Sequence, residues 1–411
     1  MIDYNEALGL ILKQNGSLET ETIDILQANN RTLAQEIKSP ISLPSYHNSA
    51  MDGYALRSHE TQGASSDHPI WLQPTQCIAA GDKPDSETKN IKSHTMEIMT
   101  GAPVPDLFDC VIPVENVLLS EDKSSNEIGI INPISNGSNI RYKGEDITQG
   151  DILLSKGEQI NSSRMMTLTG VGIKKIEVFK KPNLLVLATG KELAVDQPLD
   201  TKFLINDCNS PFLYTSLSNQ YSCEVRVDHI LSDTDEEFIK FMNDELSNEQ
   251  CPDIIISTGA VSAGKFDFIP RSLALMGANI IFHKVAIRPG KPILFAVLPN
   301  GTFYFGLPGN PSAVASGLRF FVYPLLRKLN HLPSEKPIYA ELDQDLSLQK
   351  PLCFFQKSFH YIDQNGISRV KILTGQASFM IKPMLQANAW VMLEFAPLSI
   401  QKKTLVAVYK F

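Results

Sequence analysis

Two stretches of this chain have the same form, an apolar run that leads into Thr-Gly: LLVLATG at 184–190 and IIISTG at 254–259. A short, continuous apolar run is typical of a strand that is covered on both faces, as the strands of parallel sheets are. Between and after the two runs, segments with helical spacing alternate with further apolar runs as far as residue 328. This alternation predicts an α/β block whose parallel sheet carries helices on both faces.

The elements expected along the chain follow from the spacing of apolar residues. In the α/β block, helices are predicted at 207–219, 233–245, 269–276 and 311–328, and further strands at 224–230, 279–285, 293–298 and 302–306. Upstream, the spacing predicts helices at 4–14, 22–37 and 159–170. The rest of 47–175 is β-rich, since Gly, Pro and Asn interrupt short apolar runs, and short strands return after Pro333.

Composition excludes several classes of partner. The chain has 37 Lys and Arg against 45 Asp and Glu, a formal net charge of −8, which argues against a general binder of nucleic acid or anionic membranes. Its longest purely apolar runs, such as 293–298, are far shorter than the roughly 18 residues that a membrane-spanning helix needs. The six cysteines form no CxxC pair, and Asp3 and Glu6 stand where a secretory signal has positive charge. We therefore expect a cytoplasmic protein.

The Thr-Gly turns are candidate ligand loops, because open α/β sheets bind ligands at the carboxyl ends of their strands. Glycine lets the backbone come close to a ligand, and free N–H groups there can hold an anion. One such turn is more often only a tight turn, but two turns in a chain that also has cationic loops favour a binding site. The candidate residues are Thr189, Gly190, Thr258 and Gly259.

Two loops rich in Pro and Gly complete this pattern, HKVAIRPGKP at 283–292 and GLPGNP at 306–311. Stiff loops lose little entropy on ordering, so they suit the holding of a phosphate or another oxyanion by basic side chains and backbone N–H groups. The alternative is a solvated basic loop, but cations on a braced backbone in a chain of net charge −8 favour an anion pocket. Its candidate residues are Lys284, Arg288, Lys291, Pro292, Pro308, Gly309 and Asn310.

A scattered set of carboxylates could add a metal ion to this pocket. Mg²⁺ prefers hard oxygen ligands and leaves coordination positions for substrate phosphates. Taken singly, each carboxylate is more often a helix cap, a turn residue or a surface charge. The set consists of Asp52, Glu115, Glu145, Asp146, Glu192 and Asp267.

Taken together, the motifs resemble those of the molybdopterin molybdenumtransferase family, which includes the MoeA proteins and the gephyrin E domain. The resemblance runs in order through nearly the whole chain. It is carried by LPSYHNSAMDGYAL (43–56), MTGAPVPDLFDCVIPVE (99–115), NIRYKGEDITQGDILLSKGEQI (139–160), ATGKEL (188–193), INDCNS (205–210), STGAVSAGKFDF (257–268), KVAIRPGKP (284–292), GLPGNP (306–311) and GQASFMIKPMLQAN (375–388).

The resemblance implies a multidomain fold of α/β and β parts, assembled as a homodimer. Residues 1–46 and 139–177 would form an extended linker domain, and 47–138 a β-rich inserted domain. Residues 178–330 would form the molybdopterin-binding α/β domain with its parallel sheet, and 331–411 a small C-terminal β-barrel. In the family, the site lies between the α/β domain of one subunit and the inserted part of the other.

The resemblance also implies a reaction and the roles of residues. Adenylylated molybdopterin and molybdate would become molybdenum cofactor and AMP, with Mg²⁺ held by Glu192 and Asp52. Transient contact with the molybdopterin adenylyltransferase or with molybdoenzyme-maturation proteins would follow. The implied catalytic residues are Asp52, Thr100, Asp146, Glu192 and Asp267, and Ser262 and Ser378 join the implied substrate-binding set.

Several positions differ from the usual family pattern. Lys191 and Lys265 stand where acidic residues are usual, Ala260 stands where a glycine is usual, and a family arginine falls near Gln356 or Lys357. These differences leave open a catalytically impaired relative that binds molybdopterin or molybdate, or acts as a scaffold. A CinA-type enzyme that shares only the α/β domain is a weaker alternative, because such a protein would lack NSAMDGYA.

Overall fold

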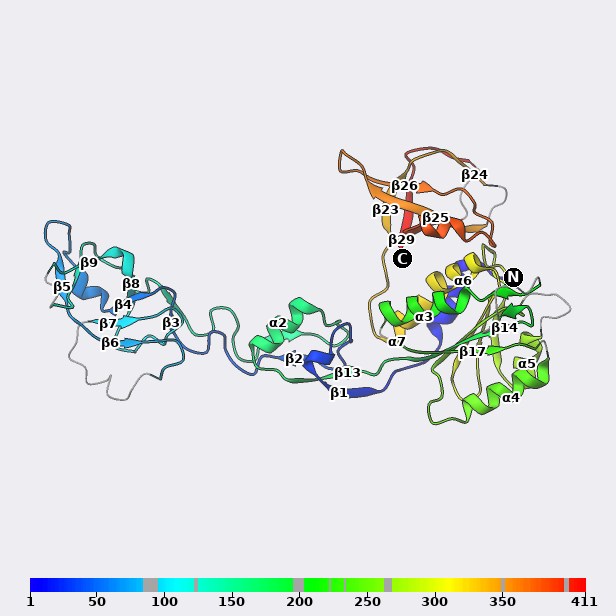
Figure 1. The fold of residues 1–411 in the computed structure, drawn as a ribbon, viewed down its shortest axis with the longest axis horizontal. Helices are drawn as coiled ribbons and strands as arrows, with labels where there is room; N and C mark the ends of the chain where they lie inside the picture. The colour runs from blue at the N-terminus through cyan, green and yellow to red at the C-terminus, as the bar shows by residue number, and fades with distance from the viewer. Residues whose placement is uncertain are drawn as a thin grey trace. The chain divides into compact units, whose positions relative to one another are not determined.

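The computed structural model describes residues 1–83, 95–121, 125–194, 203–221, 223–232, 234–261, 268–348, 352–394 and 399–411. The chain forms two compact units (Figure 1). The first comprises Met1–Ala34, Gly157–Asn161 and Ile176–Phe411, and the second comprises Gln35–Lys156 and Ser162–Lys175. The finer division into four domains stays a prediction.

The first unit is built around a six-stranded sheet in the order β17-β14-β18-β22-β21-β19. The first four strands of this order are parallel, and the last two join by antiparallel pairing. The predicted α/β fold class is thereby confirmed, with an antiparallel edge. The strands are β17 (Glu224–Ile230), β14 (Asn183–Thr189), β18 (Ile254–Thr258), β22 (Phe303–Leu307), β21 (Leu294–Val297) and β19 (Asn279–His283).

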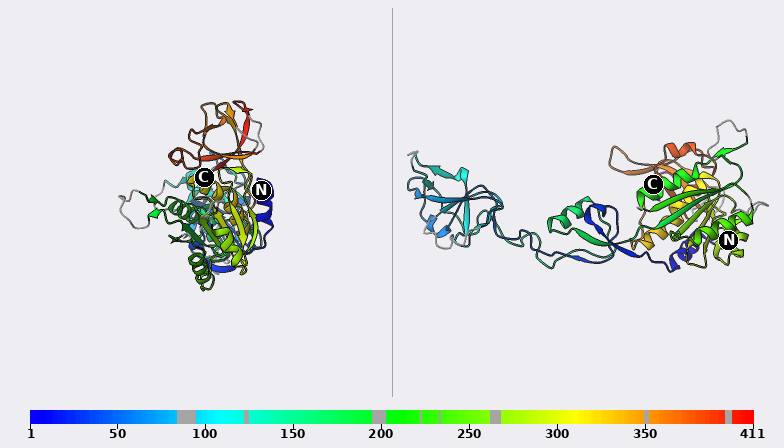
Figure 2. Two further views of the ribbon diagram at one scale, coloured as in Figure 1. Left: turned by 90° about the vertical axis from the view of Figure 1, so that its right-hand side faces the viewer. Right: turned by 60° about the horizontal axis from the view of Figure 1, so that its bottom comes forward.

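Helices cover both faces of this sheet, as Figures 1 and 2 show. Side chains alternate along β14, so Leu184 and Val186 pack on one face while Leu185 and Leu187 pack on the other. The first face meets α1 (Tyr4–Lys13), α3 (Asn209–Gln220), α6 (Pro311–Gly317), a π-helical turn (Leu318–Val322) and α7 (Tyr323–Leu329). The second face meets α4 (Asp235–Leu246) and α5 (Ile269–Leu275).

The predicted helix at 22–37 is wrong. Residues Thr20–Asp24 form β1, which pairs with β13 (Lys175–Phe179), and only a single 3-10 turn, Ile25–Gln27, follows. Ile23 and Ile25 are buried while Leu26 is 77% exposed, so the apolar residues serve a strand and a turn rather than one helical face. Asn30 then adopts a φ of 62°, which a helix does not allow.

The C-terminal part of the first unit contains a closed barrel of five strands in the order β25-β26-β23-β29-β27, with β27 pairing back to β25. The strands are β25 (Cys353–Ile362), β26 (Ser368–Ile372), β23 (Ile338–Leu342), β29 (Leu405–Lys410) and β27 (Ala389–Leu393). The short strand β20 (Ile287–Arg288) adds to β25 in parallel and ties the cationic loop to the barrel. Two ladders are smaller still: β15 (Leu193–Ala194) with β16 (Ile205–Asn206), and β24 (Leu346–Ser347) with β28 (Ser399–Ile400).

The second unit is β-rich, as predicted. One sheet contains β6 (Pro74–Ile78), β7 (Thr95–Ile98), β4 (Gly53–Leu56) and β8 (Cys110–Pro113), and another contains β5 (Ile70–Leu72), β10 (Ile128–Ile130) and β9 (Val117–Leu119). Apolar clusters lie on both sides of β4, with Tyr54 and Leu56 in one and Ala55 in the other. The unit also holds two short ladders, β3 (Asn48–Ser49) with β11 (Ile140–Arg141) and β2 (Ile37–Lys38) with β12 (Ile152–Leu154), and the helix α2 (Ser162–Gly170). Across the described part of the chain, none of the helices combines the length and the apolar character needed to cross a membrane.

Candidate functional site

Three turns meet at the carboxyl edge of the parallel strands. Thr189 Oγ1 donates to Thr258 O over 3.1 Å, and Gly259 N donates to Leu307 O over 3.0 Å. Gly259 has a φ of 95°, and a Cβ added there would lie 2.6 Å from Thr189 O. A Cβ added at Gly309 would lie 3.8 Å from the Gly259 Cα. The structure therefore brings together predicted residues from three separate loops, and Gly259 must be glycine for the loops to approach this closely.

Glu192 lies in the turn that leaves β14. A Cβ at Gly190, whose φ is 139°, would lie 2.6 Å from Glu192 Oε2, so the carboxylate folds back over the glycine. Glu192 O accepts a hydrogen bond from Ile205 N over 2.8 Å, which fixes the backbone of the turn. The Glu192 side chain remains exposed. An exposed carboxylate on a fixed backbone at this edge is available to a metal ion or a substrate.

The cationic loop returns to the same edge. Its ends are fixed by hydrogen bonds from Lys284 N to Ile293 O and from Val285 N to Lys291 O, both 2.9 Å. The strand that follows, β21, begins at Leu294 opposite Gly306, at the carboxyl end of β22. Arg288 and Lys291 are exposed, and Lys284 is half-buried.

The three cations of this loop are available to an anion. In the part of the chain that the structure describes, none of Lys284, Arg288 and Lys291 forms an ion pair with a carboxylate. Gly290 lies between Arg288 and Lys291 in the sequence. A Cβ added at Gly290 would lie 3.4 Å from Ser316 Oγ, so the loop packs against α6, the helix that follows Pro308–Asn310. Positive charge held on a fixed backbone suits the binding of an oxyanion.

Ser378 is brought to the start of α6, where Ser312 N donates to Ser378 O over 3.0 Å. Lys357, which is 1% exposed, holds the same junction: its Nζ donates to Ser312 Oγ (2.9 Å), Ala377 O (3.2 Å) and Met380 O (3.0 Å). Burial lowers the pKa of Lys357 below its ordinary value. Position 357 stood out in the sequence only as a place near which a family arginine falls. Its role at this junction was not predicted, because lysine in a strand usually points to solvent.

Asp52 and Thr100 meet in the second unit. Asp52 Oδ1 accepts from Thr100 N over 2.6 Å and from Thr100 Oγ1 over 2.7 Å, and the backbone N–H is the larger of the two causes that hold the pKa of Asp52 below its ordinary value. The next residue, Gly53, is required: a Cβ there would lie 1.9 Å from Ile112 O of β8. Asp146, in the same unit, is exposed. Asp52 therefore presents an ionised carboxylate with one oxygen free of these bonds.

Two predicted residues, Ser262 and Asp267, lie outside the described residues, as does Lys265. Among the residues that are described, no three His, Cys, Asp or Glu side chains gather as a metal site. Proteins often hold Mg²⁺ by one or two carboxylates together with the phosphates of a substrate. Asp52 and Glu192 are each exposed carboxylates, the kind of oxygen donor that Mg²⁺ prefers.

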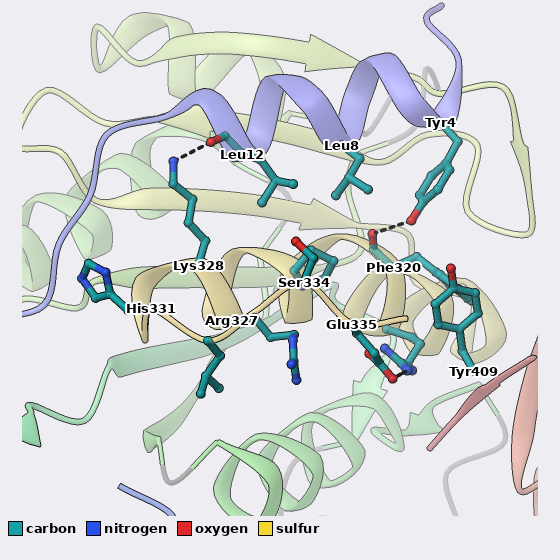
Figure 3. Close-up of a pocket in the computed structure, with 13 residues that line it drawn as sticks. Tyr4, Leu8, Leu12, Phe320, Arg327, Lys328, His331, Ser334, Glu335 and Tyr409 are labelled. Carbon is teal, nitrogen blue, oxygen red and sulfur yellow. Dashed lines mark hydrogen bonds and ion pairs between the residues drawn. The ribbon is translucent and has the colours of Figure 1, made fainter. Parts of the chain in front are cut away.

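A cavity of about 420 Å³ lies elsewhere in the first unit (Figure 3). It is lined by α1, the π-helical turn and α7, the segment after α7, and β29, and includes none of the predicted site residues. Its cations already have partners: Lys328 Nζ donates to Leu12 O at the end of α1, Arg327 donates to Pro333 O, and Arg319 pairs with Glu335. Arg319 also donates to Lys410 O of β29 over 2.9 Å. Because these contacts reach α1, the segment after α7 and β29, the cavity marks the junction of the N-terminal helix, α7 and the barrel.

Comparison with known proteins matches two regions of the chain to described families. Residues 2–172 match the family described as the MoeA N-terminal region (domain I and II), and residues 185–328 match a probable molybdopterin binding domain. A molybdopterin molybdenumtransferase of Synechococcus elongatus is 34% identical over 96% of this chain and 95% of its own length. The chain belongs to the molybdopterin molybdenumtransferase family. The resemblance that the motifs indicated is thus confirmed.

Other members of the molybdopterin molybdenumtransferase family match along almost their whole length. The enzyme of Haemophilus influenzae is 34% identical over 96% of this chain and 95% of its own, and that of Staphylococcus epidermidis is 31% identical over 95% and 91%. A solved molybdopterin biosynthesis MoeA protein of Pyrococcus horikoshii is 26% identical, with a TM-score of 0.82 and coverage of 100% of this chain and 99% of that one. The family thus shares both of the matched regions with this chain.

Proposed function

We propose that this protein inserts molybdenum from molybdate into adenylylated molybdopterin and releases AMP, as a cytoplasmic enzyme of molybdenum cofactor biosynthesis. The observation that carries the proposal is the set of three turns at the carboxyl edge of the sheet, beside a loop whose Lys284, Arg288 and Lys291 have no carboxylate partner among the described residues. Both substrates are oxyanions, and such a site binds phosphate and molybdate oxygens by charge and backbone N–H groups.

The family resemblance implies roles for single residues, and we propose them for this chain. Thr189, Gly190, Thr258 and Gly259 would hold the pterin phosphate, together with Pro308, Gly309 and Asn310. Arg288 and Lys291 would neutralise charge on the oxyanions, and we propose Lys284, Pro292, Ser262 and Ser378 as further substrate-binding residues. Cations placed where negative charge develops on the leaving AMP phosphate lower the barrier to its departure.

The carboxylates would serve Mg²⁺. Glu192 would be the ligand from the α/β domain and Asp52 the ligand from the inserted domain, with Thr100, Asp146 and Asp267 completing the catalytic set. When bound, Mg²⁺ supplies positive charge that makes a pyrophosphate easier to cleave. Thr100 contributes by keeping Asp52 ionised, since two of its donors contact one carboxylate oxygen.

We propose the four-domain division given above and a homodimer, in which Asp52 of one copy acts in the pocket of the other. Family membership supports both statements. The substrate is itself the product of an adenylyltransferase, so transient contact with that enzyme or with molybdoenzyme-maturation proteins is part of the proposal.

One assay tests the proposed reaction. The purified protein is incubated with adenylylated molybdopterin, molybdate and Mg²⁺, and AMP and molybdenum cofactor are measured over time. We expect both products in equal amounts, with their formation abolished by chelation of Mg²⁺ and dependent on molybdate. Binding of adenylylated molybdopterin without release of AMP would instead identify an impaired relative that acts as a binding protein.

A further inference from the structure

His229 is placed beside the site, although no sequence motif drew attention to it. It lies on β17, opposite Ala188 of β14, one residue before the strand ends. The next residue, Ile230, accepts a hydrogen bond from Gly190 N over 3.1 Å. His229 therefore stands at the carboxyl edge of the sheet, next to the turn that carries Glu192.

The imidazole of His229 contacts the carboxylate of Asp207. Nε2 lies 3.1 Å from Asp207 Oδ2, and the side chains are 25% and 9% exposed. The other oxygen of Asp207 accepts from the backbone N–H groups of Asn209 (2.9 Å) and Ser210 (3.1 Å) at the start of α3. Since a hydrogen bond to a charged group is worth more when it is screened from water, this half-buried pair holds the start of α3 to β17.

The start of α3 in turn holds a predicted binding loop. Asn209 Nδ2 donates to Gly309 O over 2.9 Å. Gly309 lies between Pro308 and Asn310, and all three were predicted to bind an oxyanion. A continuous series of hydrogen bonds thus runs from His229 through Asp207 and Asn209 to the loop.

We infer that His229 and Asp207 are positioning residues, which fix the loop at Pro308–Asn310 in the geometry that binds the phosphate of the substrate. This inference rests on the proposed function for the identity of the substrate. A loop that only holds a phosphate of the substrate binds the ground state and the transition state equally, so its displacement weakens binding and leaves the chemical step nearly unchanged. The expected signature is therefore a higher KM at an almost constant kcat.

The test compares His229→Ala with His229→Gln, because the amide nitrogen of glutamine can replace imidazole Nε2 as a donor to Asp207. We expect His229→Ala to raise KM for adenylylated molybdopterin about tenfold, which corresponds to ~1.4 kcal/mol, and His229→Gln to restore most of the loss. Asp207→Asn, which keeps an acceptor for Asn209 and Ser210, should have a smaller effect than Asp207→Ala. Arg226→Gln is the control on the same strand, since Arg226 pairs with Glu245 instead.

Hydrogen exchange of the intact protein, without substrate, gives a second readout that does not depend on the reaction. Amide hydrogens of residues 307–314 should exchange faster in His229→Ala than in the parent and in Arg226→Gln. If the parent releases no AMP, the proposed function fails while this exchange result still decides whether the series of hydrogen bonds holds the loop. Equal exchange in parent and His229→Ala, or faster exchange with an unchanged KM in an active enzyme, would overturn the inference.

Discussion

At the scale of single residues, the candidate site consists of side chains whose chemistry is set by a few local contacts. The sequence identified Asp52, Glu192, Arg288 and Lys291 because charged residues stood beside glycine and proline in recognisable motifs. It indicated Lys357 only as a departure from a family arginine and did not identify His229, since the contacts of both are made with residues distant in the chain. Residues in an unusual local sequence can therefore be predicted from motifs, whereas residues that act through tertiary contacts cannot.

The contact between Thr100 and Asp52 leads to a prediction about how the stability contributed by Asp52 depends on pH. Thr100→Val removes the hydroxyl donor and keeps the backbone N–H, so the pKa of Asp52 should rise but stay below its ordinary value. A lowered carboxyl pKa stabilises the folded state above the unfolded pKa of about 3.9, and this contribution is lost as the pH falls through the folded value. As the pH is lowered, the stabilisation by Asp52 should therefore persist to a lower pH in the parent than in Thr100→Val.

An NMR titration of the Asp52 carboxyl carbon measures this difference. Thr148→Val is the matched control, since Thr148 Oγ1 donates to Gly144 O in the same unit and does not contact Asp52. Identical titration midpoints for Asp52 in the parent and in Thr100→Val would contradict the assigned role of the hydroxyl.

Ala260 makes a prediction about stability. It has a φ of 50°, a left-handed conformation that costs a residue with a Cβ roughly 1–2 kcal/mol, whereas glycine adopts it freely. Glycine loses more chain entropy than alanine on folding, which offsets part of this gain. Ala260→Gly should therefore raise the free energy of unfolding by about 0.5–1 kcal/mol. Urea unfolding measures it, with Ala274→Gly in α5 as a control that should lose about 1 kcal/mol. A loss in both variants would show that position 260 is not strained.

At the scale of elements, the strands and helices of the α/β block were predictable because each apolar run is bounded by turn residues. The expected strand at 224–230 matches β17, and the expected helix at 311–328 spans α6, the π-helical turn and α7. The failure at 22–37 arose because Ile23 and Leu26 happen to be three residues apart, while pairing of β1 with β13 decided the conformation. Strand β27 (Ala389–Leu393) was not among the predicted elements, although it is an apolar run, and its antiparallel pairing with β25 and β29 places it in the barrel.

The junction between α6 and the barrel rests on Lys357. Lys357→Met keeps an unbranched side chain, one atom shorter, and removes the donor to Ser312 Oγ, Ala377 O and Met380 O. We expect a loss of about 2 kcal/mol in the free energy of unfolding, since buried and part-buried acceptors lose a donor, and a lower kcat because the segment that carries Ser378 loses two of its hydrogen bonds. Urea unfolding and AMP release measure the two effects. Lys371→Met, at an exposed position of β26, should change neither, and a similarly silent Lys357→Met would refute the role of the junction.

At the scale of the whole molecule, Asp52 and Glu192 belong to different compact units of the chain. Sequence comparison predicted that these residues act together across a homodimer, and no periodicity or spacing within one chain could have indicated it. Family membership supports the shared site, whereas the contacts within each unit support the roles proposed for the residues of that unit.

Mixed dimers test the shared site. After subunit exchange between Asp52→Ala and Glu192→Gln proteins in equal amounts, half of the dimers are mixed, and each mixed dimer has one intact site if the site is shared. AMP release should then recover to about a quarter of the parental rate. Absence of recovery, with exchange demonstrated by mass spectrometry of differently labelled chains, would place Asp52 and Glu192 of one chain in the same site.

The central claim is that the carboxyl edge of the α/β sheet carries out the reaction, and Glu192→Gln tests it most directly, because this change keeps the size of the side chain and removes its charge. Glu192 folds over Gly190 and makes no ion pair among those that the structure describes, so the substitution should leave the fold intact. AMP release from adenylylated molybdopterin is measured at saturating molybdate and Mg²⁺, with substrate binding measured in parallel. The account predicts binding close to that of the parent and AMP release slower by about 100-fold, the loss expected when one charge-stabilising group is removed. Release of AMP at the parental rate would contradict it.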